Sequence, residues 1–378
     1  MSIFDRFNKV FFLGAGVMAE RIYKQNPSLK NKKIGAIDLF DDNRRKIKEF
    51  MGISVVNPET VKDELSRNDV AIVVAIGSVC ACDVCQEYIK KYAKRTDNLI
   101  VPNPYTTLRF SFCDEDVSKE TMLPKSAPEY VQVRKLFNDD ESINTFDMIM
   151  KSKVYDGPED DYELVMYDDI RDMYYYGEKY GFDEVVVNQD DWKTVLDCGA
   201  FIGDSIEDIC KELRNGRILY YAFEPQVANY EAILKNEGLR KHCTDLRVIN
   251  SGVGEKNEIL EFMVPPSGAR DGGHIVYAEA DKNSAEIMKC KISAIDSLNL
   301  EVRGNLFIKM DIEGAELGAL KGAEGLIRKC HPALSICVHH RKNDITQIPL
   351  FVKSLGVDYN YYLRGGYHTI LLAIPKKK

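Results

Sequence analysis

The chain has 378 residues, a formal net charge of −8 at pH 7 and a hydrophobic content of 45%. This length predicts two or three domains, each large enough for its own core. The negative charge argues against a general nucleic-acid-binding protein, which needs a basic face, and no apolar run is long enough to span a membrane. The ten cysteines are scattered and no secretory signal opens the chain, so we expect a cytoplasmic protein with reduced thiols.

The first part of the chain, residues 1–107, alternates apolar segments with helical ones. Strands are expected at 9–13, 33–37 and 70–76, and a glycine loop at 14–19 separates the first strand from a helix. This order of elements is typical of a parallel sheet covered by helices. We therefore expect a small Rossmann-like α/β domain in this part of the chain.

The loop Gly14-Ala-Gly-Val-Met-Ala19 has the spacing of a dinucleotide-binding turn. It can hold a nucleotide, with Asp38 at the end of the next strand on the ribose. The same glycines also suit a tight turn with close helix packing and no ligand. Both interpretations stay open. The first supports an alternative function, an NAD(P)-dependent oxidoreductase or a nucleotide-sugar-binding protein.

Three thiols, Cys80, Cys82 and Cys85, follow the third strand of this domain. A closed zinc site needs four ligands, and no matching pair of cysteines or histidines lies nearby, so no metal is expected there.

Residues 108–190 are expected to form a connecting region with helices near 130–136 and 142–150. Its tyrosine-rich end, around Tyr174 to Tyr180, is interpreted as packing in preference to sugar stacking.

The second half of the chain opens with a buried strand that ends at Asp197 and turns through Gly199 and Gly203 into a helix. Glycines at these positions let the backbone approach a ligand closely. The next apolar strand, 219–223, ends at Glu224, an acid that can accept hydrogen bonds from both ribose hydroxyls. An acid ahead of the first glycine favours a cofactor that carries an ammonium group over one that carries a pyrophosphate.

A third strand, 305–310, ends in Lys309-Met-Asp-Ile-Glu-Gly-Ala-Glu316. Together with Asp-x-Gly-Ala-x-x-Gly and Phe-Glu-Pro, this motif resembles the FkbM family of S-adenosylmethionine (SAM)-dependent methyltransferases over roughly residues 190–375. The resemblance implies a class I methyltransferase domain at 191–378, with a Rossmann-like seven-stranded sheet that ends in an antiparallel hairpin. It also implies SAM as cofactor and methyl transfer to oxygen on a sugar, a glycan or a glycosylated small metabolite.

The expected cofactor-binding residues lie at the carboxyl ends of the predicted strands, with those at 251 and 252 suggested by the family's adenine pocket. They are Asp197, Gly199, Ala200, Phe201, Gly203, Asp204, Ser205, Glu224, Pro225, Ser251, Gly252 and Asp311.

Five residues are expected to act on the acceptor. Asp311 and Glu313 can take the proton of an attacking hydroxyl or position hydroxyls, and Lys309 can stabilise charge. His339 and His340 follow another buried strand and suit a general base or a substrate contact. As alternatives, acids of this motif can cap the following helix, the histidines can be structural, and the histidine pair with Asp311 can bind a metal; the metal ranks lowest.

Two further segments can border the acceptor. One is the loop 265–274 with Arg270 and His274, and the other is the terminal hairpin with Arg364, Tyr367 and His368; a plain hairpin connection is the alternative for the first. The expected partner is a small-molecule or saccharide acceptor, with neither nucleic acid nor membrane, and a homo-oligomer is compatible with the sequence. The remaining alternative is a binding or scaffold protein in which both nucleotide-binding folds are inactive remnants.

Overall fold

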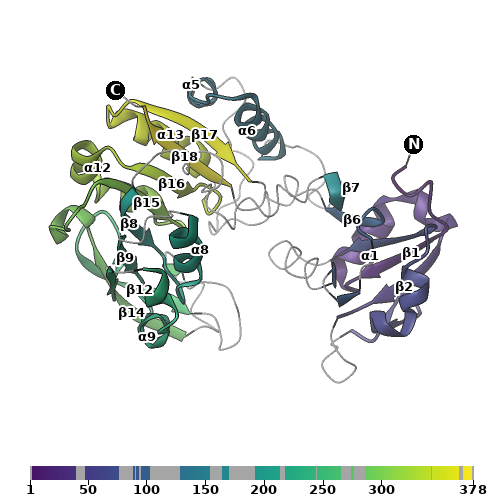
Figure 1. Cartoon of the computed structure of the whole chain (residues 1–378). Helices are drawn as coiled ribbons and strands as arrows, with labels where there is room; N and C mark the ends of the chain where they lie inside the picture. Colours follow the sequence, from purple (N-terminus) through teal and green to yellow (C-terminus); the bar gives the residue numbers. More distant parts are fainter. Residues whose placement is uncertain are drawn as a thin grey trace. The chain divides into compact units, whose positions relative to one another are not determined.

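The computed structural model divides the chain into two compact units, each described by itself (Figure 1). One comprises Met1–Ser111 with Met148–Tyr175, the other Phe112–Asp147 with Tyr176–Lys378. The structure describes residues 2–39, 47–75, 88–89, 91–92, 95–102, 128–153, 164–169, 192–212, 218–243, 245–264, 274–275, 286–341, 343–365 and 369–376. The cysteine cluster at 80–85, the tyrosines at 174–180, Arg270, Tyr367 and His368 lie outside these residues.

The first unit contains a seven-stranded sheet in the order β3-β4-β2-β1-β5-β6-β7, of which β3 and β7 run antiparallel to their neighbours. Its central strands are apolar throughout and buried, as expected of parallel strands covered on both faces. The strands are β1 (Lys9–Leu13), β2 (Lys33–Ile37), β3 (Glu49–Phe50), β4 (Ile53–Val56), β5 (Val70–Val74), β6 (Leu99–Pro102) and β7 (Leu164–Met166).

The glycine loop of this unit connects β1 to α1 (Val17–Gln25). Gly14 has a φ of +92°, and its N–H donates to the carbonyl of Ile37 at 3.0 Å. This left-handed turn accounts for a glycine at position 14 through backbone geometry alone. Further short helical segments of this unit include η1 (Pro27–Asn31), η2 (Pro58–Val61) and α2 (Lys62–Leu65).

The second unit is built on a seven-stranded sheet in the order β10-β9-β8-β15-β16-β18-β17. Within this sheet, β18 runs opposite to the other six strands, so the sheet ends in the antiparallel pair expected from the sequence and confirms the predicted α/β class. The strands are β8 (Trp192–Cys198), β9 (Leu219–Phe223), β10 (Asp245–Ile249), β15 (Asn305–Met310), β16 (Ala333–Cys337), β17 (Tyr359–Arg364) and β18 (Ile370–Pro375).

Helices and a smaller sheet complete this unit (Figure 1). The helical segments are α8 (Asp204–Glu212), α9 (Val227–Lys235), α10 (Leu239–His242), η8 (Ile295–Leu298), α11 (Glu316–Lys321), α12 (Glu324–Cys330) and α13 (Asp344–Ser354). The smaller sheet, in the order β11-β14-β12-β13, consists of β11 (Gly252–Val253), β12 (Glu258–Val264), β13 (His274–Ile275) and β14 (Glu286–Ser293). Within the described part of the chain, no helix has the length and apolar character that crossing a membrane requires.

The order of the large sheet reverses between β8 and β15. From β8 the chain proceeds outward through β9 to β10, and it returns on the other side of β8 as β15. Lys309 of β15 pairs in register with Asp197 of β8, so the ends of the two strands lie side by side. Ligands of open α/β sheets bind outside the carboxyl ends of strands at such a reversal point.

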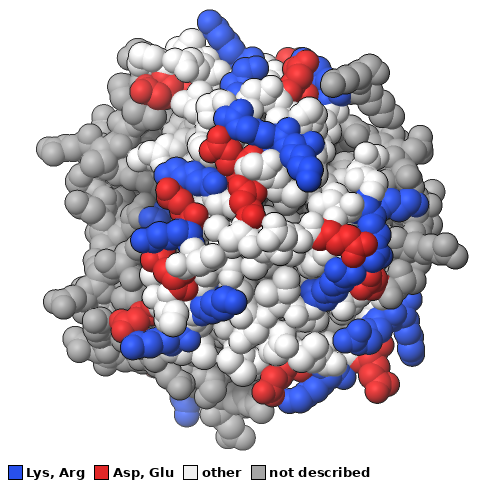
Figure 2. All heavy atoms as spheres, turned by 90° about the vertical axis from the view of Figure 1, so that its left-hand side faces the viewer, with Lys and Arg blue, Asp and Glu red and all other residues white. Residues whose placement is uncertain are grey.

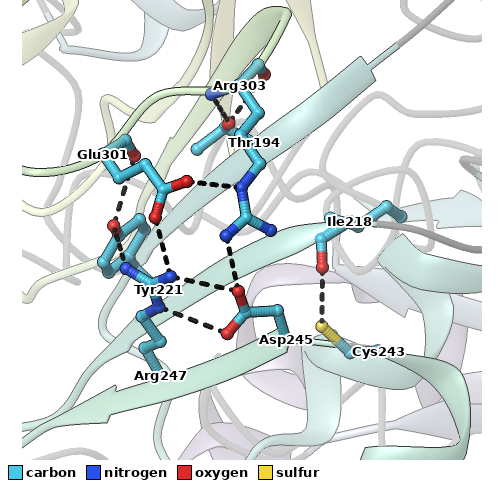
Figure 3. Close-up of polar contacts among 8 residues, drawn as sticks. All are labelled: Thr194, Ile218, Tyr221, Cys243, Asp245, Arg247, Glu301 and Arg303. Atoms are coloured by element: carbon cyan, nitrogen blue, oxygen red, sulfur yellow. Dashed lines mark hydrogen bonds and ion pairs between the residues drawn. The ribbon is translucent and has the colours of Figure 1, made fainter.

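The amino ends of the same strands are linked by a ring of ion pairs (Figure 3). Arg247 contacts Asp245 at 3.1 Å and Glu301 at 2.8 Å, and Arg303 contacts the same two acids at 2.9 and 2.7 Å. Thr194 on β8 accepts a hydrogen bond from the Arg303 N–H at 2.7 Å. These contacts join the segment before β15 to β8 and β10 at the edge opposite the reversal-point site.

Two helices from the connecting region, α5 (Pro128–Arg134) and α6 (Asp140–Lys153), match the helices expected there. Arg364 of β17 is buried and donates to Asp139 at 2.5 Å and to Ser142 at 2.8 Å. Burial would raise the pKa of the Asp139 carboxyl, but hydrogen bonds from Arg364 and Ser142 hold it at about 2. The sequence predicts that Arg364 borders the acceptor. In the structure its guanidinium donates to Asp139 and Ser142 and so connects β17 to the start of α6.

Replacing Asp139 tests this anchor. Asp139→Ala leaves the Arg364 guanidinium buried without its main counter-charge, and we expect a loss of about 2–3 kcal/mol in the free energy of unfolding. Urea titration followed by the fluorescence of Trp192, the single tryptophan, reports on this unit because Trp192 is buried in β8. Glu141→Ala is the control, since Glu141 is exposed and lies 3.5 Å from Arg364; equal losses in the two variants would contradict the assignment.

Candidate active site

The glycine loop between β8 and α8 contains three residues with positive φ, the two glycines and Phe201 at +46°. Gly199 and Gly203 have φ values of +85° and +87°. A Cβ on Gly199 would lie 2.0 Å from the backbone oxygen of Asp311, so no other residue fits that position without a shift of the backbone. The N–H groups of Gly199 and Ala200 donate to the carbonyl of Phe223 at 3.1 and 3.0 Å. The loop is therefore held between the ends of β9 and β15.

Asp197 and Lys309 form a buried ion pair behind this loop. Lys309 Nζ lies 2.9 Å from Asp197 Oδ1 and donates to the carbonyl of Gly199 at 2.8 Å. The hydroxyls of Ser205 and Tyr220 both donate to Asp197 Oδ2 at 2.7 Å. Burial and the nearby Asp197 raise the pKa of Tyr220 well above its usual value, which keeps the phenol protonated as a donor.

The sequence predicts that Asp197 and Lys309 contact ligands; in the structure both side chains are buried and form an ion pair with each other. Asp197 is 0% exposed and Lys309 is 1% exposed, and they face each other. We infer that this buried pair positions the glycine loop through the Gly199 carbonyl. Ser205, also expected at the cofactor, is turned to Asp197, whereas Asp204 is exposed at the first turn of α8.

Glu224 lies at the end of β9 beside the loop. It is 4% exposed, and its Oε1 accepts hydrogen bonds from the Gln226 N–H at 2.9 Å and the Asn229 amide at 3.4 Å. Burial raises the pKa of Glu224 to about 7, although hydrogen bonds from neighbours that include the Phe201 N–H of the loop oppose the rise. The structure thus brings together Glu224 and the loop residues expected at the cofactor; Pro225 follows, partly exposed.

Ser251 and Gly252, expected near the adenine, belong to the junction with the smaller sheet. The buried Ser251 hydroxyl contacts the carbonyl oxygens of Gly252 and Lys291 at 2.8 and 3.1 Å and the Ser293 hydroxyl at 2.9 Å. A Cβ on Gly252 would lie 2.7 Å from the side chain of Ile292. Their side-chain and packing contacts are therefore directed at β14.

On the other side of the reversal point, Asp311 and Glu313 follow β15. Their side chains are 24% and 36% exposed, respectively. Glu313 has a φ of +54°, which is uncommon for a residue with a Cβ and is typical of functional sites. The Arg341 Nε donates to the carbonyl of Gly314, which fixes the turn after these acids. Two partly exposed carboxylates are thereby presented at the carboxyl edge of the sheet.

The two histidines after β16 have different surroundings. His340 is 6% exposed, and its Nε2 lies 3.4 Å from Asp311 Oδ1 and 3.6 Å from Glu313 Oε2. Burial alone would lower the pKa of His340, but the three carboxylates around it raise it to about 10. A histidine with such a pKa is already protonated at pH 7, so the geometry does not support His340 as the general base.

His339 is partly exposed, and its Nδ1 lies 3.2 Å from the carbonyl of Thr369. Its ring centroid lies 4.2 Å from that of His340. It is thus the more accessible of the two rings and the one next to the terminal hairpin.

Two buried acids of this region were not among the expected site residues. Glu316, the first residue of α11, accepts hydrogen bonds from the Ile312 N–H at 2.9 Å and from His340 Nδ1 at 2.8 Å. In the sequence, an acid five residues after Asp311 suggested only a helix cap. Asp344 accepts from the Arg341 N–H at 2.9 Å; burial, reinforced by Glu316, raises its pKa to about 7. No local sequence signal marks Asp344.

Residues 197–359 match the family model described as the methyltransferase FkbM domain, which confirms the resemblance expected from the sequence. Among solved structures, the chain is similar to methyltransferase FkbM from Methylobacillus flagellatus KT, with 18% identity, coverage of 97% of this chain and 90% of that chain, and a TM-score of 0.54. Precorrin-6y C5,15-methyltransferase from Geobacter metallireducens GS-15 is matched at 11% identity over 53% of this chain and 86% of that chain, with a TM-score of only 0.31. No curated protein matches the chain.

Gly199→Ala tests the packing of the loop. The new Cβ meets the backbone oxygen of Asp311 and the residue keeps a positive φ, so we expect a loss of about 2 kcal/mol or more in the free energy of unfolding. Gly318→Ala in α11 is the matched control, because its Cβ finds ordinary contact at 3.8 Å and alanine favours a helix. The midpoint temperature of thermal unfolding is measured for both variants. An unchanged midpoint for Gly199→Ala would contradict the loop geometry.

Proposed function

The chain carries a methyltransferase FkbM domain at residues 197–359, and we propose that this enzyme transfers the methyl group of SAM to a hydroxyl oxygen. The acceptor is a sugar, a glycan or a glycosylated small metabolite. The single observation that carries the proposal is that acidic residues lie at two places along one edge of the sheet. Glu224 lies beside the glycine loop at the end of β9, and Asp311 and Glu313 follow β15 on the other side of β8.

The cofactor side is assigned from hydrogen-bonding chemistry. Glu224 ends β9, and a carboxylate there accepts from the two hydroxyls of a ribose. The glycine loop, with Ala200 and Phe201 between its two glycines, brings backbone close to the bound molecule. Asp197 and Lys309 hold this loop from behind through Gly199. SAM, when bound, supplies a sulfonium-activated methyl group.

On the acceptor side, the partly exposed carboxylates of Asp311 and Glu313 can accept hydrogen bonds from neighbouring hydroxyls, which suits a polyhydroxylated acceptor. In the reaction, the acceptor oxygen forms a bond to the methyl carbon as the bond from that carbon to sulfur breaks. The hydroxyl proton passes to a carboxylate, for which Asp311 is the first candidate, and S-adenosylhomocysteine leaves. Alignment of the two reactants accounts for much of the rate.

We propose no nucleic-acid partner. On the face drawn in Figure 2, Lys and Arg side chains alternate with Asp and Glu side chains among the residues described, without a large area of one sign. Recognition of a phosphate backbone requires clustered positive charge. The mixed charge of this face and the net charge of −8 argue against recognition of a phosphate backbone there.

The pKa of Glu224 predicts how cofactor affinity depends on pH. The carboxyl is ionised above about pH 7 and protonated below it. If only the ionised form accepts both ribose hydroxyls, S-adenosylhomocysteine should bind roughly 20-fold more weakly at pH 5.5 than at pH 7.5, because the competent fraction falls with pH. Isothermal titration calorimetry across this range measures the effect.

Glu224→Gln should bind weakly and with little dependence on pH, whereas Glu231→Gln on the exposed face of α9 should behave as wild type. A wild-type affinity that does not change between pH 5.5 and 7.5, or a Glu224→Gln variant that keeps the wild-type profile, would remove Glu224 from the cofactor site.

Asp311→Asn tests the acceptor side. We expect methyl transfer to fall by about 10²–10⁴-fold with S-adenosylhomocysteine binding retained, because the amide cannot take the hydroxyl proton. The assay follows labelled methyl groups from SAM into a panel of monosaccharides, nucleotide sugars and glycosides. Asp358→Asn, at a 73% exposed side chain, is the control. Undiminished transfer in Asp311→Asn would exclude Asp311 from proton transfer.

A further inference from the structure

The ring of His340 lies between carboxylates at the ends of β15 and β16. Glu316 Oε1 lies 2.8 Å from Nδ1, while Asp311 Oδ1 and Glu313 Oε2 lie 3.4 and 3.6 Å from Nε2. Glu316 is 0% exposed and His340 is 6% exposed, whereas the side chains of Asp311 and Glu313 are partly exposed. The imidazole therefore connects a fully buried carboxylate to the two carboxylates of the acceptor side.

The buried end of this connection is fixed by the backbone. Glu316 Oε1 accepts a hydrogen bond from the Ile312 N–H at 2.9 Å as well as from His340 Nδ1. An ionised carboxylate accepts hydrogen bonds and donates none, so Nδ1 carries the hydrogen of the second contact. Ile312 directly follows Asp311 in the chain. One carboxylate thus holds both the turn that carries Asp311 and the ring that faces it.

The imidazole of His340 carries a positive charge at neutral pH. Burial alone would lower the pKa of His340, but the surrounding carboxylates of Glu316, Asp311 and Glu313 raise it to about 10. The N–H at Nε2 then faces Asp311 Oδ1 and Glu313 Oε2 at ion-pair distances. A nearby opposite charge favours the ionised form of a carboxylate, and only this form of Asp311 can take a proton from a hydroxyl.

Other side chains at the end of β16 also approach the Asp311 carboxylate. Ligand atoms of Asp311, Cys337 and His339 all lie within 4.8 Å of one another. Burial, together with the charge of Asp311 and a hydrogen bond to it, raises the pKa of the Cys337 thiol well above its usual value, so the thiol stays protonated. The end of β16 thus restrains this carboxylate, and His340 adds the positive charge.

We propose that Glu316 and His340 are positioning residues of the methyl-transfer reaction, which keep the Asp311 carboxylate ionised and oriented toward the acceptor hydroxyl. This inference deepens the proposed function and rests on it. The hydroxyl proton still passes to Asp311. His340 keeps both of its ring hydrogens throughout, so no proton moves along the pair. The loss of either residue acts on the reaction through Asp311 and leaves Glu224, on the cofactor side, unaltered.

The coupling between His340 and its carboxylates can be measured without any substrate. The six histidines of the full chain are labelled with carbon-13 at Cε1, and the His340 resonance is identified by its loss in His340→Gln. In the wild type, this resonance should remain that of an imidazolium as the pH rises toward a pKa of about 10. Asp311→Asn and Glu316→Gln should each lower the pKa of His340 by roughly 1–3, because each removes an opposite charge.

The rate of methyl transfer at different pH values separates positioning from a purely structural role. In Glu316→Gln the amide oxygen still accepts both hydrogen bonds but lacks the charge, so His340 loses its proton at a lower pH than in the wild type. At saturating SAM, the rate relative to wild type should be nearly unchanged at about pH 6.5 and roughly 10–100-fold lower at about pH 9, because a neutral ring no longer orients Asp311. A structural defect would lower the rate by the same factor at every pH.

Other titratable groups beside His340 do not produce this pattern. Burial, reinforced by Glu316, raises the pKa of Asp344 to about 7. Glu316→Gln removes that reinforcement, so Asp344 ionises at a lower pH in the variant and stays charged in the alkaline range. His339, whose ring centroid lies 4.2 Å from that of His340, and Arg341 are the same in both chains. The relative rate above neutral pH therefore reports on His340.

His340→Gln is the second variant. Without the imidazolium, Asp311 remains beside Glu313 and takes up a proton at a higher pH than in the wild type. The decline of the transfer rate toward acid pH should consequently begin at a higher pH. A decline at the wild-type position, in a variant whose folding is verified by circular dichroism, overturns the inference.

Glu324→Gln is the matched control for Glu316→Gln, because Glu324 is likewise the first residue of a helix, α12, but its side chain is 44% exposed and pairs with Arg328. Its His340 resonance and its transfer rate should equal those of the wild type. An unchanged pKa of His340 in Asp311→Asn overturns the inference. A loss of rate in Glu316→Gln that is independent of pH overturns it equally.

Binding of S-adenosylhomocysteine, measured on the same preparations, separates this inference from the proposed function. A wild-type chain that binds it and transfers methyl groups while His340 is neutral near pH 7 overturns the positioning role and leaves the methyltransferase assignment in place. A His340 that is coupled to Asp311 and Glu316, in a chain that does not bind S-adenosylhomocysteine, supports the buried pair and contradicts the proposed cofactor.

Discussion

The buried ion pair between Asp197 and Lys309 is the contact on which the candidate site depends. It joins β8 to β15 at the point where the order of the sheet reverses, and Lys309 also holds the carbonyl of Gly199. Taking two charges out of water is costly, and such a pair is retained when its geometry and extra hydrogen bonds compensate. Here Ser205 and Tyr220 supply those bonds, so the charges specify one loop conformation beside Glu224.

On the acceptor side too, a buried carboxylate with several hydrogen bonds connects neighbouring elements. Glu316 at the start of α11 holds both the Ile312 N–H and His340, and so joins the turn after β15 to the end of β16. The cofactor side and the acceptor side are thus each fixed by buried carboxylates that do not themselves reach the surface. The groups that remain partly exposed, Asp311 and Glu313, are available for the acceptor.

The remainder of the second unit supports this edge from a distance. The ion-pair ring of Asp245, Arg247, Glu301 and Arg303 connects the amino ends of the strands, and Arg364 anchors α6 on β17 through Asp139. The ring lies at the amino ends of the strands, opposite Glu224 and Asp311, whereas Arg364 ends β17 at the carboxyl edge, three strands along the sheet from β15. They leave the reversal point of the sheet as the place where loops, acids and glycines converge.

The sequence alone determined the α/β class, the strands that end in acids and the glycine loop, because apolar runs, glycines and the residues after them are local patterns. Only the tertiary structure decided what each acid contacts. Asp197 pairs with Lys309 on the neighbouring strand, His340 is held by Glu316 from 24 residues away, and Arg364 pairs with Asp139 across 225 residues. Partners across neighbouring strands depend on sheet order, and no local pattern encodes which buried charge lies opposite which.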